Sequence, residues 1–299
     1  MATDAEPITE LNRQDHADLD LRTTSDLVLL INDEDATVAA AVRDAAETLS
    51  AAIDAIVDRL AAGGRLVYVG AGSSGRLAVL DAAECGPTFG TAPGQVVALV
   101  AGGADAVAVA QEAAEDDEVA GTADLQELTV GELDAVVALS ASGTTPYVLA
   151  AAAAAADAGA LTIGVACVPG SALAELVDHQ VDVVVGPEVI VGSTRMKAGT
   201  AQKLVLNTIS TVSMVRLGKT YGNLMVDVVA SNAKLRRRVR RAVELATGAS
   251  GPEVEATLEA ADGEAKVAIV SLLSGIDAAA ARARLGRAGG VVRAALEDR

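Results

Sequence analysis

Two short segments rich in glycine and hydroxyl side chains carry the clearest chemical signal in this sequence. Residues 70–76 read Gly-Ala-Gly-Ser-Ser-Gly-Arg, and residues 140–146 read Ser-Ala-Ser-Gly-Thr-Thr-Pro. Each follows an apolar run and opens a helix-like stretch, so backbone amides, hydroxyls and a helix N-terminus gather there. This combination suits a phosphate monoester, and two such loops around one ligand favour a sugar phosphate over a pyrophosphate. The expected binding residues are Gly72, Ser73, Ser74, Ser140, Ser142, Gly143, Thr144 and Thr145.

Two other interpretations of these loops stay open at this point. The first loop also matches the G-x-G-x-x-G pattern of dinucleotide-binding folds. A ribose would need an acidic residue at the end of the second strand, but residues 100–103 read Val-Ala-Gly-Gly, and Asp105 lies past both glycines. Alternatively, the Ser and Thr residues serve only as helix N-caps, and the glycines only permit tight turns. The presence of two such loops weakens this last alternative.

Carboxylates are the expected acid and base groups, because the chain has only two histidines, His16 and His179. Glu84 ends the helix expected after the first loop, and Glu115 ends the helix expected after the second strand. A carboxyl group beside an apolar pocket has a raised pKa and can serve as a general acid or base. From the residues alone, a solvated glutamate at a helix end is the favoured interpretation for each.

A cationic segment stands out in this very acidic chain. Residues 192–203 read Gly-Ser-Thr-Arg-Met-Lys-Ala-Gly-Thr-Ala-Gln-Lys. Arg195 and Lys197 are the candidates for neutralising a phosphate or a developing enolate. The alternative is ion pairing with the abundant Asp and Glu residues, and the residue types alone slightly favour it.

Apolar runs that alternate with helix-like stretches predict an α/β fold with a parallel sheet sandwiched by helices. The expected strands are residues 65–70, 96–100, 134–139, 161–166 and 181–185. The expected helices between them cover 76–84, a stretch after Gly103 through Glu115, and 147–158. Ligands in such sheets bind at the carboxyl ends of the strands, which is where both hydroxyl-rich loops lie.

Helices are also expected before and after the sheet region. Residues 1–25 are polar and predict an extended or capping arm. Residues 26–62 predict two helices, with residues 32–35 between them as an N-cap. Residues 194–230 predict one or two long helices, and residues 233–299 predict a small three-helix appendage.

Composition excludes several classes of partner. The formal net charge is -18 and aromatic residues make up 1% of the chain. Nucleic-acid binding needs clustered cations and stacking platforms, so no nucleic acid is expected. The N-terminus lacks an apolar signal core and the apolar runs are too short to span a bilayer, so we expect no membrane partner and a cytoplasmic protein. Cys85 and Cys167 form no CxxC motif and, with two histidines, no zinc set.

Taken together, the motifs resemble the N-acetylmuramic acid 6-phosphate etherase family of the sugar isomerase (SIS) fold group. The resemblance spans about residues 8–235, and the run from Gly192 to Asn207 is highly specific. The matching stretches are residues 31–35, 70–76, 80–85, 87–90, 101–103, 114–116, 142–143, 145–147, 192–207 and 222–227. The resemblance implies an N-terminal arm with helices at 1–54, an SIS sugar-phosphate-binding domain at 55–222 and a helical C-terminal region at 223–299.

The resemblance also implies an activity. The family cleaves the lactyl ether of N-acetylmuramate 6-phosphate to N-acetylglucosamine 6-phosphate and D-lactate in cell-wall sugar recycling. It needs no metal or other cofactor and is typically a homodimer. Its two catalytic glutamates correspond to Glu84 and Glu115, with Glu115 as the C2 base and Glu84 as the acid for the leaving group and then the base for water.

Three positions depart from the family pattern. Gly86 stands where the family usually has Pro, Thr144 where it has Arg, and Val168 where it has Asn. Thr144 matters most, because the second loop then lacks a cation. Two further hypotheses remain beside the etherase: a sugar-phosphate-binding regulator without chemistry, and an NAD-dependent dehydrogenase supported only by the glycine motif.

Overall fold

The computed structural model describes residues 7–228, 230 and 232–298 of the chain. Contacts divide the chain into two compact units. One comprises Met1–Ala82 and Gly94–Ser210, and the other comprises Ala83–Pro93 and Thr211–Arg299. The division at 1–54, 55–222 and 223–299 expected from the sequence is a different one and stays a prediction.

A five-stranded parallel sheet forms the centre of the first unit, in the order β2-β1-β3-β4-β5. Its strands are β1 (Leu66–Gly70), β2 (Val96–Val100), β3 (Ala135–Leu139), β4 (Leu161–Ala166) and β5 (His179–Asp182). Every residue of β1, β3 and β4 is buried, as expected for Val-rich strands covered on both faces. The predicted parallel α/β sheet is confirmed.

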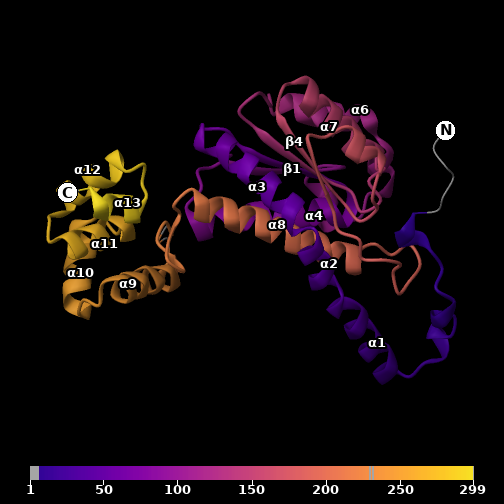
Figure 1. Ribbon diagram of the computed structural model, residues 1–299, viewed down its shortest axis with the longest axis horizontal. Helices are drawn as coiled ribbons and strands as arrows, with labels where there is room; N and C mark the ends of the chain where they lie inside the picture. Colours follow the sequence, from indigo (N-terminus) through magenta and orange to yellow (C-terminus); the bar gives the residue numbers. More distant parts are fainter. Residues whose placement is uncertain (1–6, 229, 231, 299) are drawn as a thin grey trace. The chain divides into compact units, whose positions relative to one another are not determined.

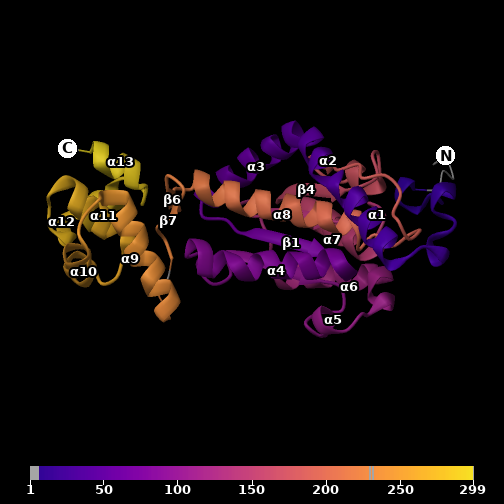
Figure 2. The same ribbon diagram turned by 90° about the horizontal axis from the view of Figure 1, so that it is seen from below.

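Helices cover both faces of this sheet. Two helices, α6 (Glu118–Glu127) and α7 (Pro146–Asp157), lie on one face, and α3 (Ala46–Ala61) packs on β3, β4 and β5 from the other (Figure 1 and, from below, Figure 2). The alanines of α7 allow its backbone to approach the strands closely. The remaining helices with residues in this unit are α1 (Thr24–Ala36), α2 (Val38–Asp44), α4 (Gly72–Phe89), α5 (Asp105–Ala108), α8 (Lys197–Arg216) and five short 3-10 helices, Ile8–Glu10, Gln14–His16, Leu19–Leu21, Glu112–Asp116 and Ala172–Glu175.

Four local expectations for this unit were wrong. Residues 26–62 were expected to form two helices but contain parts of three, α1, α2 and α3. Residues 32–35 lie inside α1, because the Thr23 hydroxyl caps that helix at its start by accepting a hydrogen bond from the Asp26 amide at 3.2 Å. The helix expected through Glu115 ends at Ala108, and the chain runs extended before the 3-10 turn Glu112–Asp116. The strand expected at 181–185 is instead His179–Asp182, because an edge strand paired only with β4 tolerates polar side chains.

The second unit is mainly helical. It contains a hairpin of β6 (Thr220–Tyr221) and β7 (Leu224–Met225), followed by α9 (Ala233–Thr247), α10 (Gly251–Ala260), α11 (Ala265–Ser274), α12 (Ala278–Arg287) and α13 (Val292–Glu297). The expectation of helix over 194–230 is wrong after Arg216, because Gly218 adopts a φ of 72° and the chain turns. The prediction of a three-helix tail is also wrong, because the described residues after 232 form the five helices α9 to α13. Gly275 ends α11 in the left-handed conformation, and Asp277 caps the start of α12.

Valine, isoleucine and alanine side chains from α9 to α13 form the core of the second unit. The expected helical N-terminal and C-terminal parts are therefore both present. Within the described residues, no helix combines the length and apolar character needed to cross a membrane.

Candidate active site

The first loop connects β1 to α4 within the first unit and requires glycine for steric reasons. Gly72 opens α4 with a φ of 52°, in the left-handed region that favours glycine. A Cβ at Gly75 would lie 2.6 Å from Val100 Cγ2 and 2.7 Å from the Gly70 carbonyl oxygen. The G-x-G-x-x-G spacing therefore brings the start of α4 close against the strand ends. Ser73 and Ser74 stand in the first turn of the helix, where backbone amides lack intrahelical partners.

The Glu115 carboxylate lies directly at this helix start. A Cβ added to Gly72 would be 2.5 Å from Glu115 Oε1, so only glycine leaves room for the carboxylate in this position. Burial raises the pKa of Glu115 above its ordinary value, and the neighbouring charges of Asp116 and Glu112 raise it further, while Arg76 opposes the shift. A half-buried carboxyl group with a raised pKa is suited to proton transfer.

The second loop holds its own shape through hydroxyl groups. The buried Ser140 Oγ accepts a hydrogen bond from the Gly143 amide at 3.0 Å and lies 2.8 Å from Thr145 Oγ1. Ser142 Oγ lies 2.8 Å from Thr144 Oγ1. Ser140 therefore organises the loop in the manner of a capping residue, whereas Ser142 and Thr145 line the cavity beside the first loop.

We call this space the loop cavity; it has a volume of about 510 Å³. Its lining combines side chains from separate parts of the first unit. Among the residues predicted for binding and catalysis, it includes Gly72, Ser73, Ser74, Ser142, Thr145, Arg195 and Glu115. Ser140, Gly143, Thr144 and Lys197 are not part of the lining, and their predicted contacts with phosphate stay predictions.

The two predicted cations differ in their surroundings. Arg195 is exposed at the cavity and, among the described residues, has no ion pair or side-chain hydrogen bond. Lys197 is buried, and its Nζ donates to Glu34 Oε2 at 2.6 Å. The backbone amides of Lys197 and Ala198 donate to the buried Glu188 carboxylate at 3.0 and 2.9 Å. Arg195 is therefore available to an anion, while Lys197 would have to leave its ion pair.

Three charged side chains of the loop cavity, Arg76, Glu10 and Glu112, were not among the predicted site residues. Arg76 closes the first loop, and its Nε donates to the Ala106 carbonyl at 2.9 Å. The position of Arg76 directly after the glycine motif could have identified it as a site residue. Glu10 comes from the N-terminal arm and lies against Gly192, where any Cβ would collide with the Glu10 carboxylate. No local sequence pattern indicates that a residue so far from the loops reaches them.

Glu84 is the predicted catalytic residue that the loop cavity does not contain. It lies on α4 in the second unit and its side chain is exposed. The lining of the loop cavity, taken over the described residues, contains Glu10, Glu112 and Glu115 but not Glu84. The pairing of Glu84 with Glu115 in one site stays a prediction.

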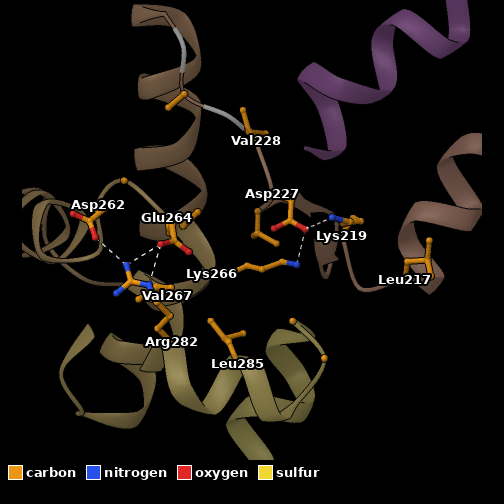
Figure 3. A pocket seen from close by; sticks show the side chains of 17 residues that line it. Leu217, Lys219, Asp227, Val228, Asp262, Glu264, Lys266, Val267, Arg282 and Leu285 are labelled. Carbon is orange, nitrogen blue, oxygen red and sulfur yellow. Dashed lines mark hydrogen bonds and ion pairs between the residues drawn. The ribbon is translucent and has the colours of Figure 1, made fainter. Parts of the chain in front are cut away.

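A second cavity, of about 740 Å³, lies within the second unit between residues 217–228 and 230 on one side and helices α11 and α12 on the other (Figure 3). Asp227 Oδ2 meets Lys266 Nζ at 2.6 Å and Lys219 Nζ at 3.3 Å. On the opposite wall Arg282 pairs with Asp262 and Glu264, at 3.1 and 2.8 Å. These charges neutralise one another, so this cavity offers a ligand less uncompensated charge than the loop cavity does.

The geometry gives no support to a metal or dinucleotide site. Within the part of the chain that the structure describes, no group of three or more His, Cys, Asp or Glu side chains is placed to hold a metal ion. Asp105, the nearest candidate for a ribose contact, opens α5 and does not line the loop cavity. Hydroxyls, first-turn amides and Arg195 instead suit a phosphate monoester, with Glu115 beside it for acid or base chemistry.

Comparison with known proteins first defines the class. Residues 109–211 match the SIS domain, and residues 48–156 match the N-terminal SIS domain of glucokinase regulatory protein. A structure described as a putative phosphosugar isomerase involved in capsule formation, from Bacteroides fragilis, is 22% identical with a TM-score of 0.50, and the match covers 65% of this chain and 91% of that one. The chain is an SIS-domain protein with the α/β fold expected from its sequence.

Full-length relatives then define the family. The N-acetylmuramic acid 6-phosphate etherase of Rubrobacter xylanophilus is 60% identical over 293 residues, which cover 98% of this chain and 97% of the relative. That of Streptomyces coelicolor is 55% identical over 288 residues, covering 96% and 93%. The chain belongs to the N-acetylmuramic acid 6-phosphate etherase family, and the resemblance drawn from its motifs is confirmed.

Proposed function

We propose that this enzyme cleaves the D-lactyl ether of N-acetylmuramic acid 6-phosphate and releases N-acetylglucosamine 6-phosphate and D-lactate. Membership of the etherase family supports this substrate. The observation that carries the proposal is the loop cavity, where two hydroxyl-rich loops meet a half-buried Glu115 whose pKa is raised. The phosphate of the substrate binds at the two loops and Arg195, and this remote contact holds the sugar carbons for reaction.

The chemistry proceeds through an elimination and a hydration. In the open-chain sugar, the C2 proton is acidic because it lies next to the C1 aldehyde. The ionised Glu115 removes this proton, and the enolate expels the lactate oxygen from C3 as an acid protonates it. Water then adds to C3 of the unsaturated aldehyde, and C2 regains a proton. The raised pKa of Glu115 makes it a stronger base than an ordinary glutamate, which suits a group that must take up and return a proton.

We propose Glu84 as the second carboxylate and a homodimer as the working form. Helix α1 has no buried residue, and Val28 and Leu29 are 62% and 60% exposed, so it offers an apolar surface that a second copy can cover. Glu84 is likewise exposed, which leaves it free to act in the loop cavity of a second copy. Its role there is to protonate the leaving oxygen and then to activate water.

Mixing two inactive variants tests this arrangement. Glu84→Gln and Glu115→Gln should each remove most activity. If the two glutamates meet across copies, unfolding and refolding a mixture of the variants restores about a quarter of wild-type activity, since half of the dimers carry one intact site. Absence of restored activity, with mixed dimers present, contradicts Glu84 acting in a second copy.

We also propose a cytoplasmic enzyme of cell-wall sugar recycling. Cys167 is a buried thiol outside any disulfide, which fits a reducing compartment. Burial raises the pKa of the Cys167 thiol to about 12, which keeps it protonated and unreactive.

Product analysis tests the proposed activity. Incubation with N-acetylmuramic acid 6-phosphate should release D-lactate and N-acetylglucosamine 6-phosphate in equal amounts. A regulator without chemistry would instead bind the sugar phosphate and raise the melting temperature of the protein without releasing lactate. Saturable binding of the sugar phosphate without release of lactate would therefore identify the protein as a regulator and contradict the proposed activity.

A further inference from the structure

A buried glutamine lies behind the phosphate-binding loop and is bonded to one of its hydroxyls. Ser74 Oγ donates to Gln202 Oε1 at 2.7 Å, joining the first turn of α4 to α8. Gln202 is 1% exposed, and its Nε2 has no hydrogen-bond partner. Ser74 lines the loop cavity, whereas Gln202 does not. Gln202 can therefore act on a ligand only through Ser74.

The number of protons at this contact limits what Ser74 can bind. A serine hydroxyl has one proton to donate, and here that proton is directed at Gln202. A phosphate dianion has only acceptor oxygens, so Ser74 cannot bind it while donating to Gln202. The amide nitrogen of Gln202 carries two protons that no described group accepts. A half-turn of the carboxamide would place one of these donors against Ser74 Oγ and free the hydroxyl proton.

We propose that Gln202 is a positioning residue for phosphate binding, a role that rests on the proposed sugar-phosphate function. When the ligand enters, the Gln202 carboxamide rotates, its Nε2 donates to Ser74 Oγ, and Ser74 donates its proton to a phosphate oxygen. The amide thus selects a phosphate ester by turning the hydroxyl toward an acceptor. An unphosphorylated sugar gains nothing from this rotation.

Replacing the amide with groups of different hydrogen-bonding capacity separates this role from packing. The carboxylate of Gln202→Glu accepts the Ser74 proton and cannot donate, so phosphate binding should weaken about tenfold or more once the carboxyl ionises. As the pH falls and the carboxyl regains its proton, it can donate to Ser74 and affinity should recover. Gln202→Met can neither donate nor accept a hydrogen bond and leaves the Ser74 hydroxyl free to turn. It should therefore lower phosphate affinity only a few-fold. Gln126→Glu, on the exposed surface of α6, adds the same charge elsewhere as a control.

Calorimetric titration with N-acetylglucosamine 6-phosphate and with N-acetylglucosamine, from about pH 6 to about pH 9, measures the effect as a ratio to wild type. The proposal predicts that Gln202→Glu loses affinity in a pH-dependent way for the phosphorylated ligand only. Gln126→Glu should show no such loss, and the loss should disappear when Gln202→Glu is combined with Ser74→Ala. A ratio independent of pH, or an equal loss for both sugars, overturns it.

A second comparison applies if Gln202→Glu does not fold. Ser74→Ala should then cost less phosphate affinity in a Gln202→Met background than in wild type, because without the amide the hydroxyl is not oriented. An equal cost in both backgrounds overturns the proposal. Binding does not depend on turnover, so a wild-type protein that binds the phosphorylated sugar but releases no lactate refutes the proposed activity without deciding the role of Gln202.

Discussion

Replacing Gly72 with alanine should displace the Glu115 carboxylate, the proposed base, while leaving the fold in place. The new Cβ would lie 2.5 Å from Glu115 Oε1, whereas ordinary contacts begin near 3.4 Å, so the carboxylate must retreat by about 1 Å. Because the colliding atom lies at the end of a flexible side chain, the collision moves the Glu115 carboxylate more than it destabilises the fold. A shift of about 1 Å in a reacting group lowers turnover by on the order of 100-fold.

The stability cost of the same substitution comes from the backbone. Gly72 has a φ of 52°, where a residue with a Cβ loses about 1–2 kcal/mol. Gly94→Ala provides the matched control, since Gly94 has a φ of 80° and nothing within 4 Å of its Cβ position. It should lose comparable unfolding free energy and keep its activity.

The assay compares kcat for lactate release with the free energy of unfolding from denaturant titration. Gly72→Ala should lose both activity and about 1–2 kcal/mol of stability, and Gly94→Ala only the stability. Wild-type kcat in Gly72→Ala would refute the placement of Glu115 at the reacting carbons. An equal fall of kcat in Gly94→Ala would show that strain, not the collision, is responsible.

Three further predictions concern charged groups. Arg195→Ala should raise KM for the phosphorylated sugar about tenfold or more with a smaller change in kcat, because an exposed cation at the cavity is lost; an unchanged KM would contradict its contact with phosphate. The acidic limb of the kcat/KM profile should lie above the ordinary pKa of glutamate, since activity is lost as pH falls through the raised pKa of Glu115. Asp116→Asn removes a neighbouring negative charge and should move that limb to lower pH; a limb that stays in place means that another group titrates. Lys197→Met should destabilise the protein by about 1–3 kcal/mol, because Glu34 loses its buried partner, with KM unchanged; a raised KM at unchanged stability would instead support the phosphate contact predicted for Lys197.

The sheet was predictable because its signals are local. Runs such as Leu66–Gly70 and Ala135–Leu139 consist of hydrophobic residues and glycine, and glycines and polar residues bound them. The predicted position of the edge strand β5 was wrong, because its pairing with β4 and not its own hydrophobicity sets where it begins and ends. The hairpin at Thr220–Met225 carried a recognisable Gly-Asn turn that was missed inside a stretch interpreted as helix.

The site was predictable only where its residues belong to the loops themselves. Ser73, Ser74, Ser142 and Thr145 follow the strand ends, so the parallel topology alone brings them together. Glu10 could not be placed, because its position depends on how the N-terminal arm returns to the sheet. The sequence likewise showed two cations two residues apart, but only packing shows that Lys197 turns inward to Glu34.

Isotope analysis of the products tests the central claim most directly. The protein is incubated with N-acetylmuramic acid 6-phosphate in water labelled with oxygen-18, and both products are weighed by mass spectrometry. Elimination followed by hydration predicts D-lactate without the label and N-acetylglucosamine 6-phosphate with a labelled oxygen at C3, in addition to any label that C1 gains by exchange of the open-chain aldehyde with water. Labelled lactate would show that water attacks the lactyl carbon instead, and no lactate from folded protein would contradict the proposed activity altogether.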